Sequence, residues 1–168
     1  MSFTKTLIVM GFLLISACDY QVPLSASNII PIDNDALGIW QLVNEKEEPA
    51  EADVVTILRF SDTEYLLQHR SNGFSIYFRA YLIDVVDRVL LQAEVIGSEE
   101  GPPKESYKEL FSVIAYTIEG DELTFSSLNT ELIDTGISSS EVLRDAFIKE
   151  KDNPDLFTDQ TRFKRVLP

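Results

Sequence analysis

The sequence has one cysteine, one histidine, one tryptophan, and only 14 basic residues against 28 acidic ones. A single cysteine, Cys18, excludes an intrachain disulfide, so packing alone must stabilise the fold. A single histidine, His69, excludes a metal site built from several histidines. The formal net charge of −14 opposes binding to nucleic acid or to anionic lipid. No apolar run reaches the roughly 20 residues that a membrane-spanning helix needs.

Signs of catalysis are also scarce. The sequence has no Gly-x-Ser-x-Gly nucleophile motif and no phosphate-binding glycine loop. His69 follows a stretch of strand-like residues, where we expect it to be solvated or hydrogen-bonded. The acidic segments Asp33–Asp35 and Asp152–Asp155 offer oxygen ligands, but neither has the spacing of a calcium loop. We therefore expect no enzyme, no metal site and no cofactor.

The N-terminus has the order of a bacterial export signal. Lys5 supplies a positive charge, Thr6–Ile15 form a short apolar run, and Leu14-Ile15-Ser16-Ala17-Cys18 ends it. This pentapeptide resembles the lipobox of bacterial lipoproteins, in which a peptidase cleaves before the cysteine and the cysteine is acylated. The resemblance implies a signal peptide over residues 1–17, fatty acids such as palmitate on Cys18, and a membrane anchor facing the periplasm.

The residues after Cys18 bear on which membrane would hold the anchored protein. An aspartate such as Asp19 at that place resembles an inner-membrane retention signal of enterobacterial lipoproteins, but Tyr20 does not strengthen it, so inner and outer membrane both stay open. Residues 18–35 carry prolines and little periodicity, which predicts a tether whose ends lie roughly 20–25 Å apart. Residues 36–168 are long enough for one folded domain.

This domain is predicted to be mainly β, because short alternating apolar segments are separated by turn residues. Ser71-Asn72-Gly73 is typical of a tight hairpin. The expected strands are Leu37–Val43, Val54–Phe60, Glu64–Arg70, Phe74–Val85, Val89–Val95, Leu110–Ile118, Leu123–Leu128 and Thr161–Leu167.

One helix is expected before the last strand. Ser138 and Glu141 have the spacing of a capping box, and Ile137 and Val142 have that of a hydrophobic staple. An apolar stripe then follows with helical spacing. Its members are Val142, Leu143, Ala146 and Phe147. We expect this helix to lie across the sheet and to end before Pro154.

Gly38-Ile39-Trp40 at the start of the first strand looks like the Gly-x-Trp signature of lipocalins. The resemblance implies an up-and-down eight-stranded antiparallel β-barrel, with the tryptophan at its closed end and a basic residue of the last strand across it. Arg162 and Arg165 are the two candidates for that partner. The lipocalin helix follows the barrel, whereas here it precedes the last strand. A two-sheet sandwich and a half-open barrel therefore remain alternatives.

The aromatic residues of the strands suggest two functions. If the barrel is hollow, they would bind an apolar or amphipathic ligand. The residues expected to bind it are Trp40, Phe60, Phe74, Phe78, Phe125 and Phe147. If the barrel is filled, the protein would instead contact another envelope protein, as an inhibitor or assembly partner. Tyr77, Arg79 and Tyr81 could then form a contact patch.

Overall fold

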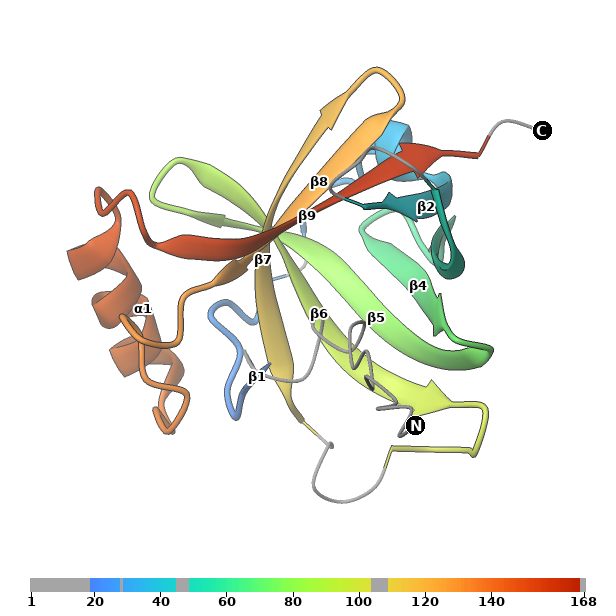
Figure 1. Cartoon of the computed structure of the whole chain (residues 1–168). Coiled ribbons are helices and arrows are strands. Elements are labelled where there is room, and N and C mark those ends of the chain that lie inside the picture. The colour runs from blue at the N-terminus through green and yellow to red at the C-terminus, as the bar shows by residue number, and fades with distance from the viewer. Residues whose placement is uncertain (1–18, 28, 45–48, 104–108, 167–168) are drawn as a thin grey trace, which may run out of the picture.

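The computed structural model describes residues 19–27, 29–44, 49–103 and 109–166 of the chain (Figure 1). Within these ranges the chain is mainly β, with one α-helix and one short 3₁₀ helix. The strands are β1 (Asp19–Tyr20), β2 (Gly38–Val43), β3 (Pro49–Arg59), β4 (Glu64–Ser71), β5 (Phe74–Val85), β6 (Arg88–Ser98), β7 (Phe111–Glu119), β8 (Glu122–Leu128) and β9 (Phe157–Arg165), and the helices are η1 (Asn34–Ala36) and α1 (Ser140–Glu150).

The strands β2 to β9 form a closed antiparallel ring, which confirms the expected up-and-down barrel-like fold with a helix before its last strand. Each strand from β2 to β9 pairs with the next one in the chain, and α1 lies in the connection between β8 and β9. The ring closes because β9 pairs with both β8 and β2. Closure leaves these strands without a free edge along the paired stretches. The two alternatives, a two-sheet sandwich and a half-open barrel, do not fit this single closed sheet.

The interior of the ring is a packed hydrophobic core. Every second residue of each strand points inward, as the pleat of a strand requires. Trp40 and Phe163 are fully buried there, and Phe78, Leu82 and Leu91 pack with them. In β5, alternate residues from Ile76 to Leu82 contribute to this core, and only Phe74 at the start of the strand is exposed.

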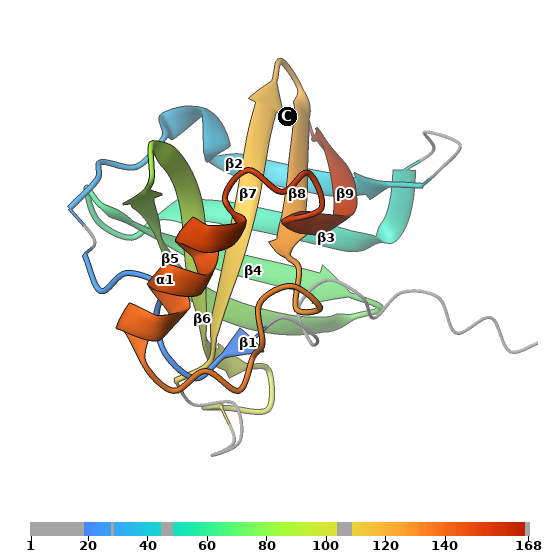
Figure 2. The same ribbon diagram turned by 90° about the vertical axis from the view of Figure 1, so that its left-hand side faces the viewer.

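A second core lies outside the ring, between the strands and α1. The alternate residues Ile83 of β5, Leu90 of β6 and Val113 of β7 point outward and pack against the helix residues Leu143 and Phe147. Figure 1 shows α1 on one side of the ring and β2 on the other, and Figure 2 shows the helix lying over β5 and β6. The ring thus has one outer side covered by a helix and another that no helix covers in the described part of the chain.

The helix begins one residue later than expected. Ser139, not Ser138, is the N-cap, and its side-chain oxygen accepts a hydrogen bond from the Val142 backbone N–H. The predicted capping box and hydrophobic staple are therefore wrong. Of the predicted apolar stripe, Leu143 and Phe147 are buried, whereas Val142, about 100° around the helix from Leu143, is 54% exposed.

The stretch expected to be a tether is packed against the ring wherever the structure describes it. Asp19 and Tyr20 form β1, which pairs with the start of β7. Tyr20 and Leu24 are buried in the outer core, and Ile32 is buried in the inner core. A flexible tether over residues 19–35 is therefore a wrong prediction. Cys18 and the apolar run before it lie outside the described residues. No helix in the described ranges is long and apolar enough to span a membrane.

Candidate functional site

One end of the ring is closed around Trp40. Gly38 has a φ of +140°, a conformation that residues with a side chain rarely adopt, and a Cβ here would lie 2.8 Å from Nη1 of Arg165. The Arg165 guanidinium lies 4.0 Å above the Trp40 ring and donates hydrogen bonds to the carbonyls of Leu37 (2.7 Å) and Asp35 (2.6 Å). Of the two candidates, Arg165 and not Arg162 is thus the partner of Trp40.

The 3₁₀ helix η1 covers this closed end. The Trp40 indole Nε1–H donates to the Ala36 carbonyl at 2.9 Å, and the backbone N–H of Asp33 donates to the Tyr65 hydroxyl at 2.6 Å. Burial raises the pKa of Tyr65 to about 12, so its hydroxyl is protonated at any ordinary pH. Trp40 therefore acts as a plug of the core and is not available to a ligand.

A cavity of about 40 Å³ remains inside the ring, towards the other end of the strands. Its lining is mainly apolar, and Phe78 and Phe125 contribute to it, as does His69. Ligand pockets for drug-sized molecules have volumes of roughly 300–1,000 Å³. A cavity of this size has room for a few water molecules and not for a lipid or a similar ligand.

The other aromatic residues expected to bind a ligand lie elsewhere. Phe60 is 63% exposed just past the end of β3, and Phe74 is 36% exposed at the start of β5. Phe147 is buried in the outer core, where its ring packs edge-on against Phe157 with 6.3 Å between centroids. The six predicted residues are therefore divided among the closed end, the cavity, the surface and the helix interface, and do not form one site.

His69 is the most unusual group at the cavity. Its Nε2 is buried and has no hydrogen-bond partner among the described residues, with the nearest carboxylate oxygen, Oδ1 of Asp53, 3.9 Å away. Burial lowers the pKa of His69, while the charge of Asp53 acts in the opposite direction. At Nε2 the histidine is thus neither solvated nor hydrogen-bonded to a described residue, contrary to the expectation from sequence.

At the same end of the ring, Asp19 lies beside the cavity lining. The Ser112 hydroxyl, which lines the cavity, donates to Oδ1 of Asp19 at 2.6 Å. Burial raises the pKa of Asp19, and the Ser112 hydrogen bond partly offsets this rise. The residue that follows Cys18 directly is thus fixed to β7.

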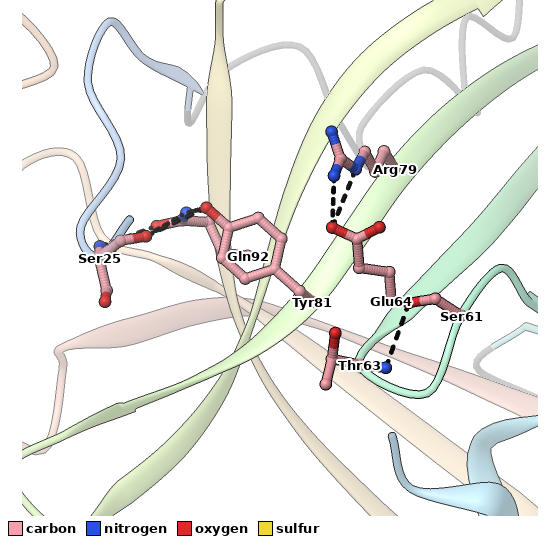
Figure 3. Close-up of polar contacts among 7 residues, drawn as sticks. All are labelled: Ser25, Ser61, Thr63, Glu64, Arg79, Tyr81 and Gln92. Atoms are coloured by element: carbon pink, nitrogen blue, oxygen red, sulfur yellow. Dashed lines mark hydrogen bonds and ion pairs between the residues drawn. The ribbon is translucent and has the colours of Figure 1, made fainter. Parts of the chain in front are cut away.

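The polar residues of β5 that suggested a contact patch are mostly engaged within the molecule (Figure 3). Arg79 forms an ion pair with the buried Glu64. Tyr81 donates to the Ser25 carbonyl at 3.1 Å, and Gln92 donates to the same carbonyl at 2.9 Å. The side chain of Gln92 also accepts the backbone N–H of Leu24 at 2.7 Å. Tyr81 and Gln92 thus hold residues 24–25 on the ring.

An apolar surface appears instead on the side of the ring away from α1. We call it the outer strip, and it consists of Ile39, Leu58, Phe60, Leu66 and Val166. Leu58 and Leu66 lie directly opposite each other on β3 and β4. The backbone N–H of Val166 donates to the Ile39 carbonyl at 2.8 Å, so these two residues are also neighbours. Ile39 is 47%, Leu58 51% and Val166 43% exposed.

The sequence carries a signal for the outer strip that strand alternation alone does not reveal. Strands with one solvated face normally alternate apolar and polar residues. In β2, Ile39 is an outward residue next to the inward Trp40, and in β3, Leu58 is an outward residue next to the inward Ile57. Apolar residues at such outward positions indicate an additional contact surface.

Comparison with known proteins does not assign a family. No family model matches the chain, and no curated protein or solved structure matches it. Among the described residues, no group of histidine, cysteine, aspartate and glutamate side chains is arranged to hold a metal ion.

Proposed function

We propose that this protein is a lipid-anchored component of the bacterial cell envelope whose filled barrel docks on another envelope protein. The proposed anchor is the acylated Cys18, on the periplasmic face of a membrane, and its basis is the lipobox-like sequence. The observation that carries the docking role is the packed interior. The closed end is plugged by Trp40, and the cavity of about 40 Å³ found among the described residues is several times smaller than a typical ligand pocket.

The outer strip supports the same role. Ile39, Leu58 and Val166 are partly exposed on neighbouring strands, so their apolar side chains contact water, and a partner could cover this apolar surface. An inhibitor or assembly partner of this kind needs no catalytic residues of its own. Nothing in the architecture requires a cofactor for this role.

Binding of a small ligand is the second candidate, and His69 favours it. A buried nitrogen without a hydrogen-bond partner is uncommon in folded proteins, and an unseen molecule that completes its bonding is one explanation. The small cavity restricts such a molecule to water or to a compound of a few non-hydrogen atoms.

Native mass spectrometry of the protein, extracted from its own envelope in mild detergent, separates the two functions. For a docking protein we expect a complex with a second protein, and a free form whose mass equals that of the acylated chain. Acyl chains on Cys18 survive denaturation because they are covalent, whereas a ligand in the barrel is lost on unfolding. A stoichiometric adduct of several hundred daltons that disappears on unfolding would overturn the docking proposal.

A further inference from the structure

Residues 19–25 contact the rest of the molecule at a few points only, and we call them the strap. Tyr20 and Leu24 are buried in the outer core. Residues 21–23 form no hydrogen bond with the ring in the described part of the chain, and residues 26–27 after the strap are exposed. The groups that hold the strap by hydrogen bonds or strand pairing are here called the strap site. They are Tyr81, Gln92, Phe111, Ser112 and Ile133.

The strap site binds the main chain of the strap through one buried amide. Gln92 of β6 is polar and yet 0% exposed. Its Oε1 accepts the backbone N–H of Leu24 at 2.7 Å and that of Ser25 at 3.2 Å. Its Nε2 donates to the Ser25 carbonyl at 2.9 Å (Figure 3). A side-chain amide offers the same kinds of donor and acceptor as a peptide group, so this contact does not depend on the side chains of the bound segment.

Two side chains of the strap make the contact specific. The Tyr20 hydroxyl donates to the Ile133 carbonyl at 3.1 Å, and Leu24 is buried in the same outer core. In front of them, β1 pairs with the start of β7, as an added peptide strand pairs with the edge of a sheet. The strap site therefore fits an aromatic residue and a leucine four positions later, on a main chain that β7 and Gln92 both bind.

The strap is also the element whose main chain has the fewest bonds to its neighbours. β1 has two residues, and its register consists of the pairs Asp19–Ser112 and Tyr20–Phe111. Segments with few backbone hydrogen bonds open locally while the rest of a protein stays folded. Opening of the strap would bring the apolar surface under Tyr20 and Leu24 into contact with water. A segment with the same chemistry could then cover that surface.

From these contacts we infer that the strap site is a peptide-binding site, which the strap fills in cis and which a segment of the partner protein fills after displacing the strap. The partner segment carries an aromatic residue followed four positions later by a leucine, and Gln92 binds its main chain. The strap is then an autoinhibitory contact. This inference rests on the proposed docking function and assigns it a binding site and a partner sequence pattern.

A synthetic peptide with the sequence of residues 19–25 tests the site itself. In the full-length protein, the double change Tyr20→Ala and Leu24→Ala weakens the strap and leaves the strap site unchanged. Fluorescence anisotropy should show that the labelled peptide binds this variant with 1:1 stoichiometry. The wild type should bind it at least about tenfold more weakly, because its own strap competes at high effective concentration. The same peptide with alanine in place of its tyrosine and leucine is the control and should not bind.

A disulfide lock in the full-length anchored protein tests whether the strap must leave before the partner binds. Asp19 and Ser112 lie directly opposite each other on β1 and β7, and their side chains are hydrogen-bonded. The changes Asp19→Cys and Ser112→Cys should therefore form a cross-strand disulfide, the strap lock. The matched control lock joins Thr117→Cys to Thr124→Cys, an opposite pair on β7 and β8.

Native mass spectrometry of envelope extracts measures the effect of each lock. With the strap lock oxidised, we expect the complex with a second protein to fall by about tenfold or more, because the strap then cannot leave its site. Reduction should restore the complex. The oxidised control lock should leave it unchanged.

Other outcomes overturn the inference. A complex that survives oxidation of the strap lock would show that the partner binds elsewhere, so the docking function would stand and only its site would be wrong. A disulfide-linked dimer through positions 19 and 112 would show that two copies exchange their straps. Failure of the peptide to bind the strap variant would exclude a peptide site, provided that the emission of Trp40 shows a folded ring. If that variant does not fold, the strap lock decides. Absence of any complex from the wild type would end the docking function as well.

Discussion

Among single residues, Trp40 makes the most consequential contacts, since it joins η1, β2 and β9 at the closed end. It is fully buried, bonded to the Ala36 carbonyl and covered by Arg165. The Gly-x-Trp motif has a clear physical basis here, because the missing Cβ of Gly38 leaves the space that the Arg165 side chain occupies. This contact was predictable from sequence because it needs only a short motif and one basic residue on the last strand.

The change Trp40→Ala should reduce the free energy of unfolding by about 3–5 kcal/mol, because it leaves a large cavity at the closed end. Urea unfolding followed by circular dichroism measures this loss. Phe60→Ala, at an exposed aromatic residue, is the control and should change stability by less than about 0.5 kcal/mol. The wild-type fluorescence should be blue-shifted and poorly quenched. A red-shifted, readily quenched emission would contradict the buried position of Trp40.

His69 should make stability depend on pH. Burial lowers its pKa in the folded protein below the ordinary value near 6.5, so the unfolded chain binds the proton more readily. The contribution is fully present above pH 6.5, and stability falls as the pH drops below that value towards the folded pKa. Melting temperatures between pH 7.5 and 5 measure it. His69→Gln should flatten this part of the curve, and an unchanged slope would show that another group causes the dependence.

Among the elements, α1 depends on two buried residues. Phe147→Ala should destabilise the protein by about 3–5 kcal/mol, since the ring is fully buried against Phe157 in the outer core. Ile148→Ala is the neighbouring control and should cost much less, because Ile148 is 39% exposed. Thermal unfolding compares the two variants. Equal effects would mean that the helix packs by a different face.

The elements also show why part of the fold was predictable. Strand alternation and turn residues such as Asn72-Gly73 act locally, and they identified the strands of the ring within a few residues. The helix start was missed by one residue because Ser138, Ser139 and Ser140 can each cap a helix. Only packing against the outer core selects Ser139. β1 was missed because two residues carry no periodicity, and its partner β7 is distant in sequence.

The candidate sites were harder to predict for a similar reason. Sequence alternation separates two faces of a strand but does not say which faces have a second layer over them. The six residues expected to bind a ligand were predicted to line a single interior. The structure instead has an inner core within the ring and an outer core between the ring and α1. Phe147 belongs to the outer core, and Phe60 to the surface. The burial of His69 could not be foreseen, because it depends on strands that the sequence does not place side by side.

For the whole molecule, the anchor is the first prediction. Cys18→Ser should abolish acylation, because the thiol accepts the first lipid. The variant should then remain as an unprocessed precursor. Metabolic labelling with a radioactive fatty acid and detergent phase partitioning measure the change. Equal labelling of the wild type and the variant would contradict the lipoprotein assignment, whatever the function of the barrel.

A second prediction concerns residues 19–25. A chain that begins at residue 26 should be less stable than one that begins at residue 19 by about 3–6 kcal/mol, because it loses the buried side chains of Tyr20 and Leu24. Urea unfolding of the two chains measures the difference. Gln21→Ala is the control and should have little effect on stability, because Gln21 is exposed between the buried residues Tyr20 and Leu24. Equal stability of the two chains would restore the interpretation of this segment as a tether.

The attachment of residues 19–25 to the ring determines how an anchored molecule would stand on its membrane. With acyl chains on Cys18, only one Cα–Cα step of about 3.8 Å and the lipid-modified cysteine itself would separate the bilayer from a residue already fixed to β7. In such a molecule, the link between the bilayer and the ring is too short to let the ring move away from the membrane. It can spin about the membrane normal, but it cannot rise towards partners deeper in the periplasm. Its docking surface would sweep a thin layer at constant height, so only partners held in that same layer, on the same membrane, would meet it efficiently.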